Sequence, residues 1–131
     1  MKYPMLYFAL LAPLMLVFAF KGATPQPDVD GNCVVKINSE WGGACKNYGN
    51  SEDKYTAELQ NDCEIAVDFM ICLQNENKTW SCFYRNDFAP KETMKASVCK
   101  GTGKILKWAR KAGDQNTVFL TEAEVNETYG N

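Results

Sequence analysis

The sequence of 131 residues contains no histidine. Histidine is the one side chain that titrates near neutral pH without help from its surroundings, so its absence removes the usual general base. Catalytic Ser-His-Asp and Cys-His arrangements are therefore excluded, together with metal sites built on imidazole ligands. The Gly-x-Ser-x-Gly nucleophile elbow and the glycine-rich phosphate-binding loops are missing as well. We expect no cofactor and no bound metal.

One catalytic class needs no histidine, namely glycan hydrolysis by two carboxylates. Glu64 and Asp68 are the pair to consider, because strand alternation places them on one face. At about 3.3 Å per residue they stand roughly 13 Å apart, beyond the roughly 5–9.5 Å that the mechanism requires. We interpret both as residues of a solvent-facing strand surface. A carboxylate-based hydrolase remains the least favoured alternative.

The chain is rich in apolar residues, which make up 46 % of it, and this is enough for a folded core. Residues 5–20 form an almost unbroken apolar run after Lys2. As a helix this run spans roughly 24 Å, short of the roughly 30 Å hydrocarbon core, so it predicts a signal peptide over residues 1–19. The alternative is an uncleaved N-terminal anchor, which would be the chain's contact with a membrane.

Six cysteines follow this segment, and an even number in a short exported chain predicts disulfides. Successive cysteines are 12, 18, 9, 10 and 17 residues apart, unlike the close pairs of a zinc site. We therefore expect a secreted or periplasmic protein. Its bridges would join Cys33, Cys45, Cys63, Cys72, Cys82 and Cys99.

A β-hairpin is the clearest predicted element. Residues 63–73 alternate, with apolar side chains at odd positions, which predicts a strand with one buried face. Residues 79–84 form a second β-rich run after the turn at 75–78. If the loop has three residues, Cys72 and Cys82 lie opposite each other at a separation that suits a disulfide. This is the pairing that geometry favours.

Other short β-rich segments are separated by turn residues. They lie at 33–37, 93–99 and 104–110, while 55–60 is compatible with a strand or a helical turn. The spacing predicts a small antiparallel β-sandwich or barrel of five to six strands over residues 33–113. A flexible lead-in at 20–32 precedes it. In the C-terminal tail, 114–131, Thr121 and Glu124 match a capping box that would open a short helix.

Charge is distributed unevenly along the chain. Residues 21–70 carry nine acids and four bases, whereas residues 91–111 carry seven bases and one acid. The basic segment predicts a surface for an acidic partner, as in an inhibitor or immunity-type protein that fills an enzyme's acidic cleft. The competing interpretation is lysines that protect strand edges. The candidate contact residues are Lys100, Lys104, Lys107, Trp108 and Arg110. We expect no nucleic-acid partner, because the exported domain is acidic as a whole.

Trp41 is the aromatic residue most expected at the surface, because Gly42 and Gly43 follow it in a loop. An exposed indole is a platform on which a sugar can stack, so a glycan-binding module is the alternative function. Trp80 lies within a strand beside Cys82 and is expected in the core. The sequence thus predicts a non-enzymatic binding protein outside the cytoplasm, with a protein or a glycan as its partner.

Overall fold

The computed structural model describes residues 32–45 and 52–130. The expected signal peptide and the lead-in up to residue 31 lie outside the described residues. The elements, in chain order, are β1 (Val34–Trp41), β2 (Lys54–Asn61), β3 (Val67–Asn75), β4 (Trp80–Phe88), β5 (Thr93–Cys99), β6 (Gly101–Lys111) and α1 (Glu122–Tyr129). No helix in these two stretches is long and apolar enough to cross a membrane.

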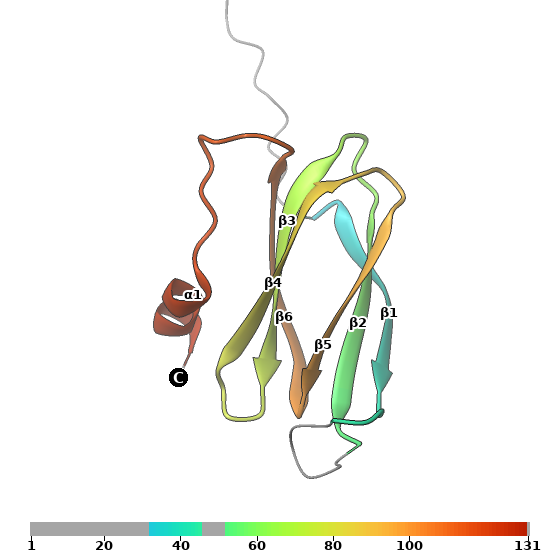
Figure 1. Cartoon of the computed structure of the whole chain (residues 1–131), viewed down its shortest axis with the longest axis vertical. Helices are drawn as coiled ribbons and strands as arrows, with labels where there is room; N and C mark the ends of the chain where they lie inside the picture. Colours follow the sequence, from blue (N-terminus) through green and yellow to red (C-terminus); the bar gives the residue numbers. More distant parts are fainter. Residues whose placement is uncertain (1–31, 46–51, 131) are drawn as a thin grey trace, which may run out of the picture.

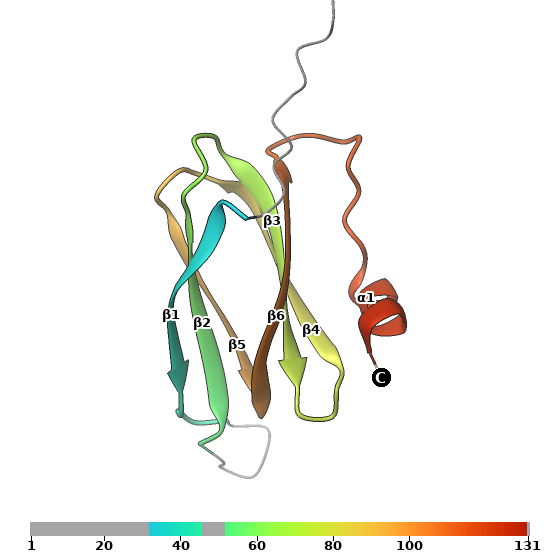
Figure 2. The ribbon, with the colours of Figure 1, turned by 180° about the vertical axis from the view of Figure 1, so that it is seen from behind.

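The six strands form two three-stranded antiparallel sheets, β1-β2-β5 and β4-β3-β6. Figures 1 and 2 show the sheets side by side, with α1 next to the β4-β3-β6 sheet. One core lies between the sheets, and its largest side chains include Tyr55, Leu59, Phe69, Ile71 and Phe88. The prediction of an all-β fold of five to six antiparallel strands is confirmed, with six strands in the described residues. The sheets in the described part stay separate and do not close into a barrel.

The predicted hairpin is formed by β3 and β4. Asn75 N–H donates to the carbonyl of Thr79 over 2.7 Å, which leaves a three-residue loop. Lys78, the last residue of that loop, has a φ of 71°, as expected for the left-handed position of such loops. In this register Cys72 pairs with Cys82, and their Cα atoms are 4.0 Å apart across a disulfide. The favoured pairing is confirmed.

The other two disulfides join segments that are distant in sequence. Cys33–Cys63 ties the start of β1 to the β2–β3 connection, and Cys45–Cys99 ties the segment after β1 to the end of β5. All six cysteines are bonded, so the prediction of disulfides is confirmed. Cross-links at both ends of the sheet pair limit how far the connecting segments can move.

The prediction of a solvent-facing side on β3 is wrong, because residues 67 to 74 are buried on both faces of the strand. The C-terminal segment covers the outer face of the β4-β3-β6 sheet, and the capping box at Thr121 opens α1 as predicted. A second apolar cluster fills the space between them. It contains Met70, Cys72, Trp80 and Val125, with Leu106, Trp108, Phe119 and Leu120 packed around it. The expected core position of Trp80 is thereby confirmed.

Candidate functional site

The structure distributes the basic segment 91–111 over both sheets. On β5 the inward residues are Met94, Ala96 and Val98, so Lys95 points away from the core on the β1-β2-β5 sheet. On β6 the alternation places Lys104 on the outward face of the other sheet. Because these faces point in opposite directions, the bases do not gather into one surface.

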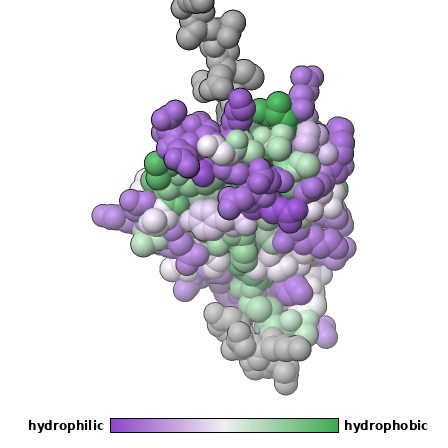
Figure 3. All heavy atoms as spheres, turned by 45° about the horizontal axis from the view of Figure 1, so that its top comes forward, coloured by the Kyte–Doolittle hydropathy of each residue, from purple (hydrophilic) through white to green (hydrophobic). Residues whose placement is uncertain are grey.

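Several bases of this segment are engaged within the protein. Lys91 Nζ lies 3.0 Å from Asp62 Oδ1, at the β4–β5 end of the sandwich. Figure 3 turns this end forward, and hydrophilic residues cover much of it. Lys107 Nζ donates to the carbonyl of Val34 on β1, across the gap between the two sheets. Lys107 is therefore engaged between the sheets, whereas Lys91 forms an exposed ion pair at the surface.

Arg110 and Trp108 hold the C-terminal segment against β6. Arg110 Nε lies 3.1 Å from Asp68 Oδ2, and the guanidinium lies 4.9 Å from the ring centroid of Phe119. Trp108 packs in the second apolar cluster, with its ring 6.0 Å from that of Tyr129. Both predicted contact residues thus have internal partners, and sequence alternation alone did not reveal them.

Trp41 lies at the end of the sandwich opposite the β4–β5 connection. It is the last residue of β1 and does not lie in the predicted loop. Its side chain is exposed as expected, at 62 %. One side of the indole is held by Tyr55, whose ring centroid is 4.7 Å away. On the other sheet, a Cβ at Gly103 would stand only 3.0 Å from Trp41 Cζ2, so glycine at this position permits the close approach. The ring is therefore fixed in place while much of it faces solvent.

A pocket of about 360 Å³ lies beside Trp41. Figure 1 shows that the end of β1, the β3–β4 hairpin and the β5–β6 turn meet at this end of the molecule. The pocket is lined by Trp41, Gly42, Glu52, Asp53, Glu76, Lys100 and Gly101. Three separate connections thus supply its walls.

The backbone of Lys100 holds these connections together. Its N–H donates to the carbonyl of Asp53 over 2.8 Å, and its carbonyl accepts from Glu76 N–H over 2.7 Å. The Cys45–Cys99 disulfide lies directly beside it in the chain. Gly42 N–H donates to the carbonyl of Lys54 over 2.8 Å, which ties the residue after β1 to the start of β2. The pocket is therefore built before any ligand arrives, which lowers the entropic cost of binding.

Three acidic residues, one basic residue and one aromatic residue are among those that line the pocket. Carboxylate oxygens accept hydrogen bonds, the ammonium donates them, and the indole offers an apolar surface. In the described stretches no group of three or more acidic or cysteine side chains is placed to hold a metal ion. The arrangement is suited to binding a polyhydroxylated ligand.

Sequence reasoning named Trp41 as a candidate sugar contact and Lys100 as part of the basic 91–111 surface, and it did not single out Glu52, Asp53 or Glu76. These residues lie in polar turn segments that show no periodicity. Their only sequence signal is that acidic residues stand next to strand ends, and that signal does not say which turns meet.

The chain was compared with protein-family models, curated proteins and solved structures. No family model, curated protein or solved structure matches it.

Proposed function

We propose that this protein is a non-enzymatic binding module that acts outside the cytoplasm and recognises a glycan through Trp41. The observation that carries the proposal is an exposed indole, held rigidly at the edge of a preformed polar pocket. Three intramolecular disulfides support an oxidising compartment.

A sugar ring matches the chemistry of this pocket. Its C–H face is apolar and packs against an aromatic ring, while its hydroxyl groups point outward around the edge. The carboxylates of Glu52, Asp53 and Glu76 accept hydrogen bonds from such hydroxyls, and Lys100 donates one. A few polar groups of defined position around an apolar surface are typical of small-ligand sites.

The basic-surface hypothesis receives less support from the geometry. Lys95 and Lys104 point from opposite sheets, and Arg110 forms an ion pair with a buried carboxylate. An acidic cleft would meet only part of the basic segment at one time. We therefore favour the pocket at Trp41 over the 91–111 surface.

The test is binding of the purified, oxidised protein to an array of immobilised oligosaccharides. We expect Trp41→Ala to abolish binding and Trp41→Phe to retain part of it, because phenylalanine keeps an aromatic face. Ile37→Ala removes another exposed apolar side chain from the same strand as Trp41 and serves as the matched control. Circular dichroism confirms that each variant is folded.

Two results would contradict the proposal. The first is a native protein that binds no oligosaccharide on the array. The second is a folded Trp41→Ala variant that binds as well as the native protein. If Lys104→Glu abolishes capture of a protein partner while Trp41→Ala does not, the basic-surface hypothesis is the better one.

A further inference from the structure

The pocket at Trp41 continues into two neighbouring hollows. A second hollow, of about 320 Å³, shares Glu76 and Lys100 with the first. A third, of about 350 Å³, shares Asn75, Ser81 and Cys99 with the second. Each hollow shares wall residues with the next, so the three hollows lie in a row, which we call the groove.

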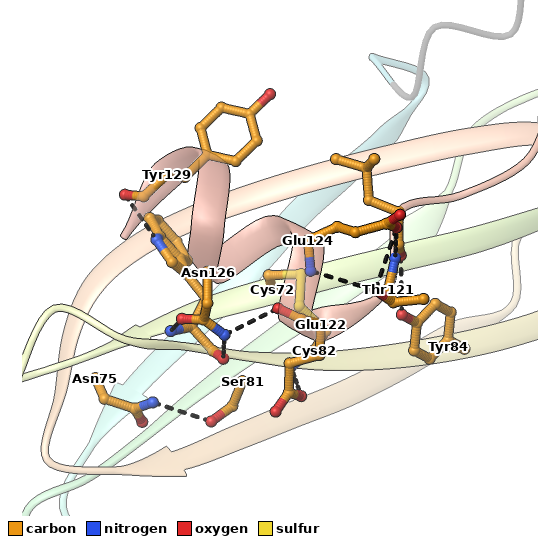
Figure 4. The surroundings of a disulfide bond; sticks show 12 residues. Cys72, Asn75, Ser81, Cys82, Tyr84, Thr121, Glu122, Glu124, Asn126 and Tyr129 are labelled. Carbon is orange, nitrogen blue, oxygen red and sulfur yellow. Dashed lines mark hydrogen bonds between the residues drawn. A yellow bond between two sulfur atoms is a disulfide. The ribbon is translucent and has the colours of Figure 1, made fainter. Parts of the chain in front are cut away.

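The groove passes the β3–β4 hairpin and then lies between β4 and β5. Ser81, Cys82 and Phe83 form one wall there, and Ser97, Val98 and Cys99 form the other. These two strands are the outermost strands of different sheets and are not paired to each other. Figure 4 shows Asn75, Ser81 and Cys82 in a row along this path. The groove ends at Glu122 on α1.

Uncharged polar side chains dominate the middle of the groove. Asn75 Nδ2 donates to Ser81 Oγ over 3.0 Å and to Thr79 Oγ1 over 3.1 Å, which fixes the orientation of the amide. Ser97 on β5 is also a lining residue, but its hydroxyl lies on the outward face of the β1-β2-β5 sheet, 2.9 Å from Thr56 Oγ1. Each hydroxyl oxygen retains further capacity to accept a hydrogen bond. Such a lining suits a chain of hydroxyl groups.

The charge of the groove argues against a polyanionic ligand. Four of its lining residues are acidic, Glu52, Asp53, Glu76 and Glu122, and one, Lys100, is basic. A sulfated or uronic-acid polymer would meet mostly like charge along its length. An uncharged polymer would meet no such repulsion.

A peptide strand is also disfavoured along the β4 wall. The backbone N–H and carbonyl of Trp80 are bonded to the side-chain amide of Asn126, at 2.6 and 2.9 Å. Cys82 N–H donates to Glu122 Oε2 over 2.9 Å. Figure 4 shows both side chains reaching from α1 to β4. Since these groups are occupied, a peptide cannot use them to extend the sheet.

We infer that the ligand is a linear, uncharged oligosaccharide, bound with one sugar on Trp41 and the following sugars along Asn75 and Ser81. This inference rests on the proposed function for the choice of a sugar. The row of hollows adds the length of the chain, and the acidic lining adds its neutrality. Affinity should therefore rise with the number of sugars.

The experiment measures affinity for uncharged glucose and N-acetylglucosamine oligomers of increasing length, by titration calorimetry. We expect affinity to rise by about tenfold or more between the single sugar and the tetramer. Ser81→Trp blocks the groove beyond Trp41 and should remove this rise, while binding of the shortest ligand is retained. Thr79→Trp, on the hairpin side of the second hollow, also blocks it and should give the same result if Ser81→Trp does not fold. Lys104→Trp, on the outward face of β6 and outside the groove, is the matched control.

The outcomes separate the two proposals. Affinity that does not change from one sugar to four would overturn the extended site and leave sugar binding at Trp41 in place. Unchanged length dependence in both blocking variants would also overturn it. Tighter binding of charged oligomers than of neutral ones would contradict the assignment of an uncharged chain. Binding of no sugar at all would refute the proposed function itself.

Discussion

Asp68 offers a sharp test of how the C-terminal segment is held. Its carboxylate is 4 % exposed and accepts three hydrogen bonds, from Arg110 Nε at 3.1 Å, Gly113 N–H at 3.2 Å and Asp87 N–H at 3.1 Å. Asp68→Ala leaves two backbone donors without an acceptor, at about 1–3 kcal/mol each. Arg110 keeps some access to water, since its side chain is 23 % exposed. We expect the free energy of unfolding to fall by about 3 kcal/mol, the lower end of the range for a buried ion pair that loses one partner.

The measurement is urea unfolding followed by tryptophan fluorescence and by circular dichroism. Glu64→Ala is the matched control, because Glu64 lies just before β3 and is exposed. We expect the control to change the free energy of unfolding by less than about 0.5 kcal/mol. Asp68→Asn keeps one acceptor oxygen and should fall between the two. Equal effects of Asp68→Ala and Glu64→Ala would refute the reasoning.

The same carboxylate predicts a pH dependence. Burial raises the pKa of Asp68, but hydrogen bonds from the backbone of Asp87 and Gly113 and from Arg110 outweigh it and hold the pKa below its ordinary value. The unfolded chain therefore binds a proton first as pH falls, from about 3.9 downward. The stabilisation by the ionised Asp68 carboxylate is present above this pH. It is lost as the pH falls through the pKa of Asp68 in the folded protein. Asp68→Asn should show a smaller loss of stability below about pH 4 than the native protein.

Three further predictions concern α1, an alkaline transition and the disulfides. Asn126→Ala should lower the free energy of unfolding by about 1–3 kcal/mol and speed hydrogen exchange in β4, whereas the exposed Asn116→Ala should do neither. Burial, and then the carboxylates of α1, raise the pKa of Tyr84. The unfolded chain therefore releases this proton first, and stability should fall as the pH rises above about 10. Tyr84→Phe should show a smaller fall. Replacing the Cys45–Cys99 pair by serines should cost about 4 kcal/mol and the Cys72–Cys82 pair about 3, from loops of 54 and 10 residues, as measured by thermal unfolding.

Features set by neighbouring residues were predictable from the sequence. The pairing of Cys72 with Cys82 depends on one short loop, and the start of α1 depends on the capping box at Thr121. The exposure of Trp41 follows from its place at a strand end before two glycines, each with a φ of 108°. In each case the deciding residues lie close together in the chain.

Features set by distant segments were not predictable. The first four odd positions of β3 are apolar and its even positions are mixed, with Asp68 and Gln74 beside Met70 and Cys72. Both faces are buried, because α1 covers the second face from more than forty residues away in sequence. From the sequence Asp68 is expected at the surface, but in the fold Arg110 and Gly113 lie beside its carboxylate and donate hydrogen bonds to it. The pocket likewise needs Asp53, Glu76 and Lys100 from three connections. Periodicity describes one segment at a time, so it does not report what covers that segment.

The covering of one sheet by the C-terminal segment also bears on where a ligand can bind. That segment buries the outward apolar face around Met70 and Trp108, and α1 occupies backbone groups of β4 at Trp80 and Cys82. The apolar face and the edge of β4 could otherwise bind other proteins through apolar contact or strand pairing. Here the C-terminal segment covers them. The end at Trp41 and the polar groove beside β4 stay accessible and are held by the Cys45–Cys99 and Cys72–Cys82 disulfides. The exposed indole and the polar groove beside it are therefore the surface at which we propose that the ligand binds.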